Sequence, residues 1–295
     1  MSLVHRFGSG ESDEGMNEKT ISVDGLKIRY LEEGSGPVVL LMHGGTLGFS
    51  ANMWLKNIAP IAAGGYRVLS YDQPGYGHSD APADFGMLYR QRFMAQFLAA
   101  LGVKKATLVG HSQAGGLVVG AALETPQLFS GIVVLGTGSL LPPLPSAGGG
   151  PKADVEPPMT EPTVEDTLRS LETTLVDHSH ITPDALAAYH ALCIGKNFAN
   201  AVKRADAVAS QGRGSAKPLW QCLGDVTIPS FYIYGANDRG NPTERLKLAR
   251  ERFPHLSFQL LDRCHHIVQW DRGEDVDRMV LAFLAGLNVK GAVTA

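Results

Sequence analysis

Six short apolar runs recur along the chain, and each is apolar at successive positions rather than at alternate ones. Runs of this kind fit strands that are buried on both faces in a parallel sheet. The stretches between several of them carry apolar residues at helical spacing. This alternation predicts a doubly wound, mostly parallel α/β sheet with helices on both faces. The predicted strands are 38–42, 67–72, 106–110, 131–136, 230–235 and 257–262, and the predicted helices are 87–101, 117–123, 243–253 and 276–287.

The sheet is predicted to begin with an antiparallel hairpin. From Thr20 onward two β-like stretches are separated by Asp24 and Gly25, a strong two-residue turn signal. Residues 1–19 are polar and have no apolar segment of a secretory signal, so we expect a flexible tail there. A length of 295 residues accommodates one large α/β domain with an inserted subdomain.

One region interrupts the alternation. Residues 140–227 show no strand pattern but a Pro/Gly-rich entry followed by helical segments at 164–175 and 183–194. A helical insertion between two sheet strands would cover the carboxyl edge of the sheet, where open α/β folds bind ligands. We therefore expect core segments 20–139 and 228–295 with a helical cap between them. A separate tandem domain is disfavoured because the later strands need the earlier sheet to be buried.

The stretch GHSQAGG, 110–116, follows directly on a predicted strand. It is either an ordinary glycine-rich loop or a nucleophile elbow, a sharp strand-to-helix turn that exposes a serine. The elbow needs small residues two positions before and after the serine, and Gly110 and Ala114 satisfy this condition. Because the strand and the helix lie on the required sides, we interpret Ser112 as the candidate nucleophile.

A serine nucleophile needs a base, and in this arrangement the chain order is serine, acid, histidine. His265 and His266 follow the last predicted strand, and one of them is the expected base. Asp238 follows the preceding strand, where it could orient the imidazole or simply form a turn. The first long parallel strand ends in His43-Gly44-Gly45, a turn that can aim the Gly45 N–H at an oxyanion. Its partner would be the N–H of Gln113.

Composition excludes several other classes of protein. A formal net charge of −3 with no basic excess gives no sign of a nucleic-acid partner. No apolar stretch approaches the length of a membrane span, so we expect a soluble protein. Three cysteines without CxxC spacing indicate neither a disulfide framework nor a zinc site and favour the cytoplasm. No metal or organic cofactor is implied, and the expected partner is a small-molecule substrate.

These motifs together resemble the α/β-hydrolase superfamily. The resemblance rests on the HG turn, the D-x-P-G-x-G-x-S-D stretch at 72–80, the elbow, the acid after the next-to-last core strand, and the late histidine. Within the superfamily the chain looks most like the meta-cleavage product hydrolases. That likeness lies in 57–68, in 177–182, and in the C-H-H-I-V-Q-W-D loop at 264–271. Its register implies that His266 is the base and that His265 stands at the family's glycine.

The chain departs from that family at three places. His111 stands where the family commonly has asparagine, and Ile267 where it has tryptophan. The resemblance implies a cap arginine for a substrate carboxylate, but Tyr189 and His190 occupy that stretch. Lys196, Lys203 and Arg204 are the cations that could replace it. The substrate-binding candidates are Gly44, Asn52, His111, Tyr189, His190, Ile267 and Trp270, and apolar pocket candidates that fit core packing equally well are Phe49, Trp54, Tyr89, Phe198 and Trp220.

The resemblance implies hydrolysis of a carbon–carbon bond in a 2-hydroxy-6-oxo-dienoate from aromatic ring degradation. The residues alone indicate only an acyl-transfer apparatus, which would also serve a carboxylesterase or lactonase. A catalytically silent hydrolase fold that binds a ligand is a third alternative. Epoxide hydrolases and dehalogenases are disfavoured because they use a carboxylate where this chain has Ser112. Apolar residues of the cap and the last helix fit either a core or an interface, so homo-oligomer formation stays open.

Overall fold

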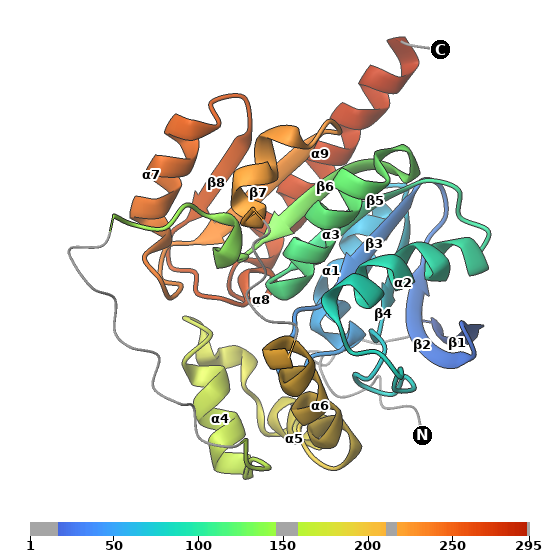
Figure 1. Ribbon diagram of the computed structural model, residues 1–295, viewed down its shortest axis with the longest axis vertical. Coiled ribbons are helices and arrows are strands. Elements are labelled where there is room, and N and C mark those ends of the chain that lie inside the picture. Colours follow the sequence, from blue (N-terminus) through green and yellow to red (C-terminus); the bar gives the residue numbers. More distant parts are fainter. Residues whose placement is uncertain (1–16, 146–158, 211–216, 294–295) are drawn as a thin grey trace.

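The computed structural model describes residues 17–145, 159–210 and 217–293. One eight-stranded sheet, in the order β1-β2-β4-β3-β5-β6-β7-β8, forms its centre (Figure 1). β3 to β8 are parallel to one another, and β2 pairs antiparallel with both β1 and β4. The predicted mostly parallel sheet is therefore confirmed. The strands are β1 Asn17–Val23, β2 Leu26–Glu33, β3 Val38–Met42, β4 Arg67–Tyr71, β5 Ala106–His111, β6 Phe129–Leu135, β7 Ser230–Gly235 and β8 Ser257–Leu261.

The opening hairpin turns where the sequence predicts it. Asp24 and Gly25 both have positive φ, 51° and 75°, as the turn between β1 and β2 requires. β1 begins at Asn17, however, so residues 17–19 pair with β2 instead of belonging to a tail. The ion pair between Lys19 and Glu32, at 2.9 Å, joins the two strands at this end. Residues 1–16 of the predicted tail lie outside the described residues.

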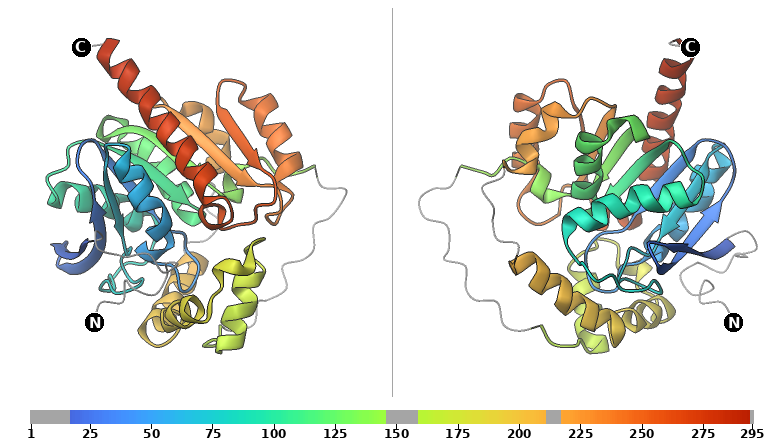
Figure 2. Two further views of the ribbon diagram at one scale, coloured as in Figure 1. Left: turned by 180° about the vertical axis from the view of Figure 1, so that it is seen from behind. Right: turned by 45° about the vertical axis from the view of Figure 1, so that its right-hand side comes forward.

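Helices cover both faces of the sheet (Figure 2). α2, α3 and α7 contribute to the apolar cluster on one face, and α1 and α9 to the cluster on the other. β3 shows why its run is apolar throughout: Leu40 belongs to the first cluster, whereas Val39 and Leu41 belong to the second. These helices and the short α8 are α1 Leu55–Ala63, α2 Met87–Ala100, α3 Gln113–Glu124, α7 Pro242–Arg252, α8 Val268–Asp271 and α9 Gly273–Val293.

Between β6 and β7 the described residues form helices and no strand. α4 (Val164–Glu172) and α5 (Pro183–Ala191) start at the predicted residues because Thr163 and Thr182 cap them, the latter with proline in the first helical position. α6 (Lys196–Ser210) follows, and η6 (Leu219–Asp225), a 3₁₀ segment, leads to β7.

These helices contact loops at the carboxyl ends of the strands (Figure 1). The Tyr189 hydroxyl of α5 donates to the backbone oxygen of Leu47, 2.9 Å away, in the loop after β3. The Arg204 guanidinium of α6 donates to the backbone oxygen of Gly75, 2.8 Å away, in the loop after β4. The helical insertion thus lies over the sheet edge that carries the sequence-predicted site. Its division from the core at residues 140 and 227 stays a prediction.

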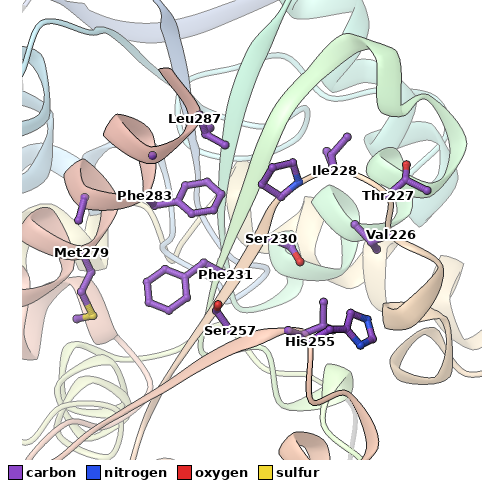
Figure 3. Close-up of a pocket in the computed structure, with 14 residues that line it drawn as sticks. Val226, Thr227, Ile228, Ser230, Phe231, His255, Ser257, Met279, Phe283 and Leu287 are labelled. Atoms are coloured by element: carbon purple, nitrogen blue, oxygen red, sulfur yellow. The ribbon is translucent and has the colours of Figure 1, made fainter. Parts of the chain in front are cut away.

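A groove of about 660 Å³ lies at the opposite end of the sheet. Figure 3 shows Phe231 of β7 and Phe283 of α9 lining it, with Ser257 of β8 nearby. Ser230, which also lines the groove, is the first residue of β7, whereas Asp238 follows the other end of that strand. The groove is therefore separate from the predicted site. None of the helices in the described ranges is long and apolar enough to cross a membrane.

Candidate active site

Ser112 lies in the turn between β5 and α3 with a positive φ, at φ 55° and ψ −122°. A non-glycine residue rarely adopts positive φ, and such strain is concentrated at functional turns. Gly110 makes the turn sterically feasible, because a Cβ there would lie 2.7 Å from the backbone oxygen of Ala114. The predicted strand–turn–helix context of GHSQAGG is thus present.

The elbow is also packed tightly against β6. Thr137, just after β6, donates its hydroxyl to the backbone oxygen of Ser112 at 2.7 Å. A Cβ on Gly115 would lie 2.0 Å from that same hydroxyl oxygen. The close approach of α3 to β6 therefore requires glycine at position 115. The hydrogen bond from Thr137 also fixes the backbone of Ser112.

Ser112, His266 and Asp238 are brought together from three separate loops. Nε2 of His266 is 2.9 Å from Oγ of Ser112, and its Nδ1 is 2.9 Å from Oδ2 of Asp238. With Nδ1–H donating to the carboxylate, Nε2 is free to take the serine proton. The arrangement has the geometry of a serine–histidine–acid triad, and its chain order matches the predicted one.

Asp238 is poised to stay ionised. Burial by itself raises the pKa of this carboxyl, but the hydrogen bond from His266, the nearby imidazole charge and the N–H of Arg239 together hold the pKa below its usual value. An ionised acid orients the imidazole and stabilises the imidazolium formed during catalysis.

The adjacent histidine has a different position. Nδ1 of His265 accepts the backbone N–H of His266 at 2.8 Å, and it lies 3.9 Å from the nearer oxygen of Asp238. Of the two candidates, only His266 contacts Ser112. The register drawn from the C-H-H-I-V-Q-W-D loop therefore agrees with the geometry.

The candidate oxyanion loop lies directly against the elbow. A Cβ on Gly44 would be 2.8 Å from Cβ of Ser112, and a Cβ on Gly45 would be 2.2 Å from Oε1 of Gln113. Within the described ranges, the N–H groups of Gly45 and Gln113 have no intramolecular acceptor. Two free backbone donors beside a serine can stabilise an oxyanion, as the sequence predicts for this pair.

Most of the chain matches one protein family. The model of the family described as alpha/beta hydrolase fold matches residues 37–273, which is most of the chain. The chain belongs to the α/β-hydrolase family. Its central sheet, elbow and loop-borne polar residues are those expected of such a hydrolase.

The chain is similar to proteins named as 2-hydroxy-6-oxo-dienoate hydrolases. The chain is 31% identical to a 2-hydroxy-6-oxo-6-phenylhexa-2,4-dienoate hydrolase of Burkholderia cepacia, over 92% of this chain and 94% of that protein. It is 29% identical to a 2-hydroxy-6-oxononadienedioate/2-hydroxy-6-oxononatrienedioate hydrolase of Cupriavidus pinatubonensis, covering 88% and 91%. A crystal structure of a membrane phospholipase A is similar in fold, with a TM-score of 0.76 at 24% identity, covering 93% and 87%.

Two of the substrate-binding candidates, His111 and Gly44, lie beside Ser112 in this α/β-hydrolase. His111 is fully buried, and its ring centroid is 5.1 Å from that of His266. Phe49 packs against His111 and against Tyr189 of the cap. These aromatic rings form a wall that runs from the elbow to α5.

Two other candidates bond protein groups outside the Ser112–His266–Asp238 set. Nδ1 of His190 is 2.8 Å from the Thr167 hydroxyl within the cap, and the indole N–H of Trp270 donates to the backbone oxygen of Met53. Ile267 is fully buried. Substrate contact by these residues stays a prediction. Asn52 lines a small cavity with Trp270 and His180, and its Oδ1 is buried with no partner among the described residues.

Two functional features were not found in the sequence. Asp271 accepts the backbone N–H groups of His265, Val176 and Asp177 at 2.7 to 2.9 Å, so its carboxylate joins the loop after β8 to the cap. Arg90, on α2, is 2% exposed and bonds Gln113 beside Ser112. Neither has a local sequence signal, because each contact depends on residues that meet only after folding.

Three of the remaining pocket candidates pack in or against the core. Trp54 is fully buried, and the hydroxyl of Tyr89 bonds Asp24 in the opening hairpin, far along the chain from the elbow. Trp220 lies under the guanidinium of Arg252. Core packing explains all three. Among the described residues, no group of His, Cys, Asp and Glu is arranged to hold a metal ion.

Proposed function

We propose that this α/β-hydrolase cleaves a carbon–carbon bond in 2-hydroxy-6-oxo-dienoates, with Ser112, His266 and Asp238 as its catalytic triad. The observation that carries the reaction class is the unbroken chain of two 2.9 Å contacts from Asp238 through His266 to Ser112. Similarity to two dienoate hydrolases over about nine-tenths of the chain supports the substrate class.

In the proposed reaction the dienol first becomes its keto form, which makes the later leaving group a stabilised dienolate. Oγ of Ser112 then attacks the distal carbonyl while His266 takes the serine proton. The N–H groups of Gly45 and Gln113 bind the oxyanion that forms. Collapse breaks the carbon–carbon bond, and the dienolate leaves and takes up a proton. Water, activated through His266, then hydrolyses the acyl-serine to a carboxylic acid.

Arg204 is the proposed partner of the substrate carboxylate. Of the three cap cations considered, Lys196 and Lys203 are exposed, whereas Arg204 is 7% exposed. Its guanidinium lies 3.6 Å from the ring centroid of Tyr76, whose hydroxyl donates to the backbone oxygen of Gly45. Burial lowers its pKa, and no Asp or Glu within the described ranges pairs with it. A buried cation without an acid partner is costly unless an anion joins it.

A carboxylesterase or lactonase is the second candidate, and the cap supports it. In the stretch where family likeness implies a carboxylate-binding arginine, Tyr189 and His190 stand, both bonded to protein oxygens. An ester needs only the triad and the oxyanion donors.

A direct substrate comparison tests the proposal. The purified enzyme is mixed with 2-hydroxy-6-oxo-6-phenylhexa-2,4-dienoate, whose visible absorbance is lost on cleavage, and in parallel with p-nitrophenyl acetate. Rapid bleaching supports carbon–carbon hydrolysis. Fast release of p-nitrophenol with a persistent dienoate would replace the proposal by the ester alternative. Tight binding of the dienoate without turnover would favour a ligand-binding protein.

A further inference from the structure

Arg90 lies in the core beside the oxyanion loop, and no Asp or Glu of the described residues pairs with it. It belongs to α2, is 2% exposed, and donates from Nη1 to Oε1 of Gln113 at 2.5 Å and from Nη2 to Oε1 of Gln73 at 2.7 Å. The ring of Tyr76 lies 5.1 Å from its guanidinium carbon. Burial of a cation is expensive, and two amide oxygens and a ring compensate it less than a carboxylate would. This arrangement calls for a functional explanation.

The bond to Gln113 fixes one half of the proposed oxyanion hole. A guanidinium only donates, so Oε1 of Gln113 must face Arg90. The same Oε1 lies so close to Gly45 that a Cβ at that position would be 2.2 Å from it. The Gln113 side chain is therefore held between Arg90 and Gly45, at the start of α3.

The bond to Gln73 fixes the other half. The side-chain amide of Gln73 donates to the backbone oxygen of His43 at 2.5 Å, and its backbone N–H donates to Nε2 of His43 at 3.1 Å. Nδ1 of His43 therefore carries the proton and donates to the backbone oxygen of Gly44 at 2.8 Å. Burial lowers the pKa of His43 to about 4, so this bonding pattern persists at neutral pH.

We propose that Arg90 is a positioning residue that holds both halves of the oxyanion hole, Gln113 directly and the His43-Gly44-Gly45 turn through Gln73. Its buried positive charge also favours negative charge on the neighbouring substrate oxygen, which appears only as the tetrahedral intermediate forms. The inference rests on the proposed roles of Ser112 and of the two backbone donors. It does not depend on whether the acyl group comes from a dienoate or from an ester.

The test compares Arg90→Met with Arg92→Met, a matched control on the same helix. Arg92 is exposed and bonds Glu124 at the surface. Each variant is assayed on p-nitrophenyl acetate and on the phenyl dienoate. Arg90→Met is expected to lower kcat about 10- to 100-fold with KM changed less than about 3-fold, because the lost interaction is made in the transition state. Arg92→Met is expected to match the wild type.

Two further measurements separate positioning from general stability. Arg90→Lys keeps the charge but reaches one glutamine at most, so its kcat is expected between wild type and Arg90→Met. A phenylboronic acid, which forms a tetrahedral adduct with serine, is expected to bind Arg90→Met more weakly by the same factor as kcat falls. Binding of benzoate, which forms no adduct, is expected to stay within about 3-fold.

The proposal is overturned if folded Arg90→Met keeps kcat within about 2-fold of wild type, or if boronic acid and benzoate weaken equally. If Arg90→Met does not fold, Gln113→Ala serves instead, because it removes the side chain that Arg90 holds and leaves the backbone N–H. An unchanged kcat in Gln113→Ala contradicts the proposal. Should the wild type cleave the ester but not the dienoate, the proposed substrate fails, and the ester data alone decide the role of Arg90.

Discussion

Nε2 of His111 lies 2.8 Å from the backbone oxygen of His266, so the residue before the proposed nucleophile is hydrogen-bonded to the proposed base. Since a carbonyl only accepts, the proton of His111 is on Nε2. Its Nδ1 is then an acceptor, buried and without a partner among the described residues. The bond joins the end of β5 to the loop after β8 and so fixes the spacing between Ser112 and His266.

A buried neutral histidine predicts acid sensitivity of the fold. Burial, with a smaller contribution from His266, lowers the pKa of His111 to about 3. Below the ordinary histidine pKa the unfolded chain takes up a proton that the folded chain excludes, so stability falls as pH drops from about 6.5 towards 3. His111→Asn, which cannot titrate, is expected to reduce this slope by up to about 1.4 kcal/mol per pH unit.

Urea unfolding of wild type and His111→Asn at several pH values between 7 and 4 measures the two slopes. Burial also lowers the pKa of His43, but His43 is present in both proteins, so its contribution to the pH dependence of stability cancels in the comparison. Parallel slopes would show that His111 is not held neutral by the fold.

The two adjacent histidines provide a test of the triad. His266→Ala removes the group 2.9 Å from Oγ of Ser112 and is expected to lower kcat by at least about 1,000-fold. His265→Ala removes an acceptor for a backbone N–H and a ring 3.9 Å from Asp238 but no contact with Ser112, and is expected to lower kcat less than about 10-fold. Steady-state kinetics on either substrate distinguishes them. A larger loss in His265→Ala would shift the base by one residue.

Alanine substitutions at two neighbouring glycines of the elbow are expected to have very different effects on stability and activity. An alanine at Gly115 would drive its Cβ into the Thr137 hydroxyl, whereas a Cβ on Gly116 meets only Leu219 at 3.8 Å. We expect Gly115→Ala to destabilise the fold by about 1 to 3 kcal/mol and to abolish most activity. Gly116→Ala should be neutral or stabilising by up to about 1 kcal/mol, as helix propensity dictates. The melting temperature and kcat of both variants measure the difference. Equal losses of stability and activity in Gly115→Ala and Gly116→Ala would contradict the packing described for the elbow.

Removal of the Arg204 guanidinium is expected to raise KM for anionic substrates and to leave KM for uncharged substrates unchanged. Arg204→Met is expected to raise KM for the dienoate about 10- to 100-fold, the range for loss of a charge-assisted hydrogen bond, and to leave KM for p-nitrophenyl acetate unchanged. Lys203→Met, on the exposed side of α6, is the matched control. An equal rise of KM for both substrates would assign Arg204 to the architecture of the cap rather than to the carboxylate.

The sheet, the strand–turn–helix context of Ser112 and the loop positions of Asp238 and His266 could be predicted from the sequence because their signals are local. β3 and β5 are apolar on both faces, Gly110 is needed within the turn itself, and Asp238 and His266 directly follow strands. Parallel strands carry their carboxyl ends to one edge, so local placement alone brings these side chains together.

The features that could not be predicted from the sequence depend on contacts between distant segments. Arg90 meets Gln73 and Gln113 only when α2 packs beside β4 and the elbow, and nothing in its own neighbourhood of the sequence distinguishes it from the exposed Arg92. The Asp271 carboxylate likewise reaches across to the cap at Val176. The early start of β1 at Asn17 depends on pairing with Glu32, which no local pattern specifies.

The most direct test of the proposed function is whether the enzyme cleaves the carbon–carbon bond of the dienoate. The phenyl dienoate is incubated in water enriched in ¹⁸O with wild type and with Ser112→Ala, and the products are analysed by mass spectrometry. We expect benzoate and 2-hydroxypenta-2,4-dienoate in equal amounts, with one ¹⁸O atom from water in the benzoate, and no products above background from Ser112→Ala. Persistence of the dienoate with the wild type, or cleavage by Ser112→Ala at a near-wild-type rate, would contradict the proposed function.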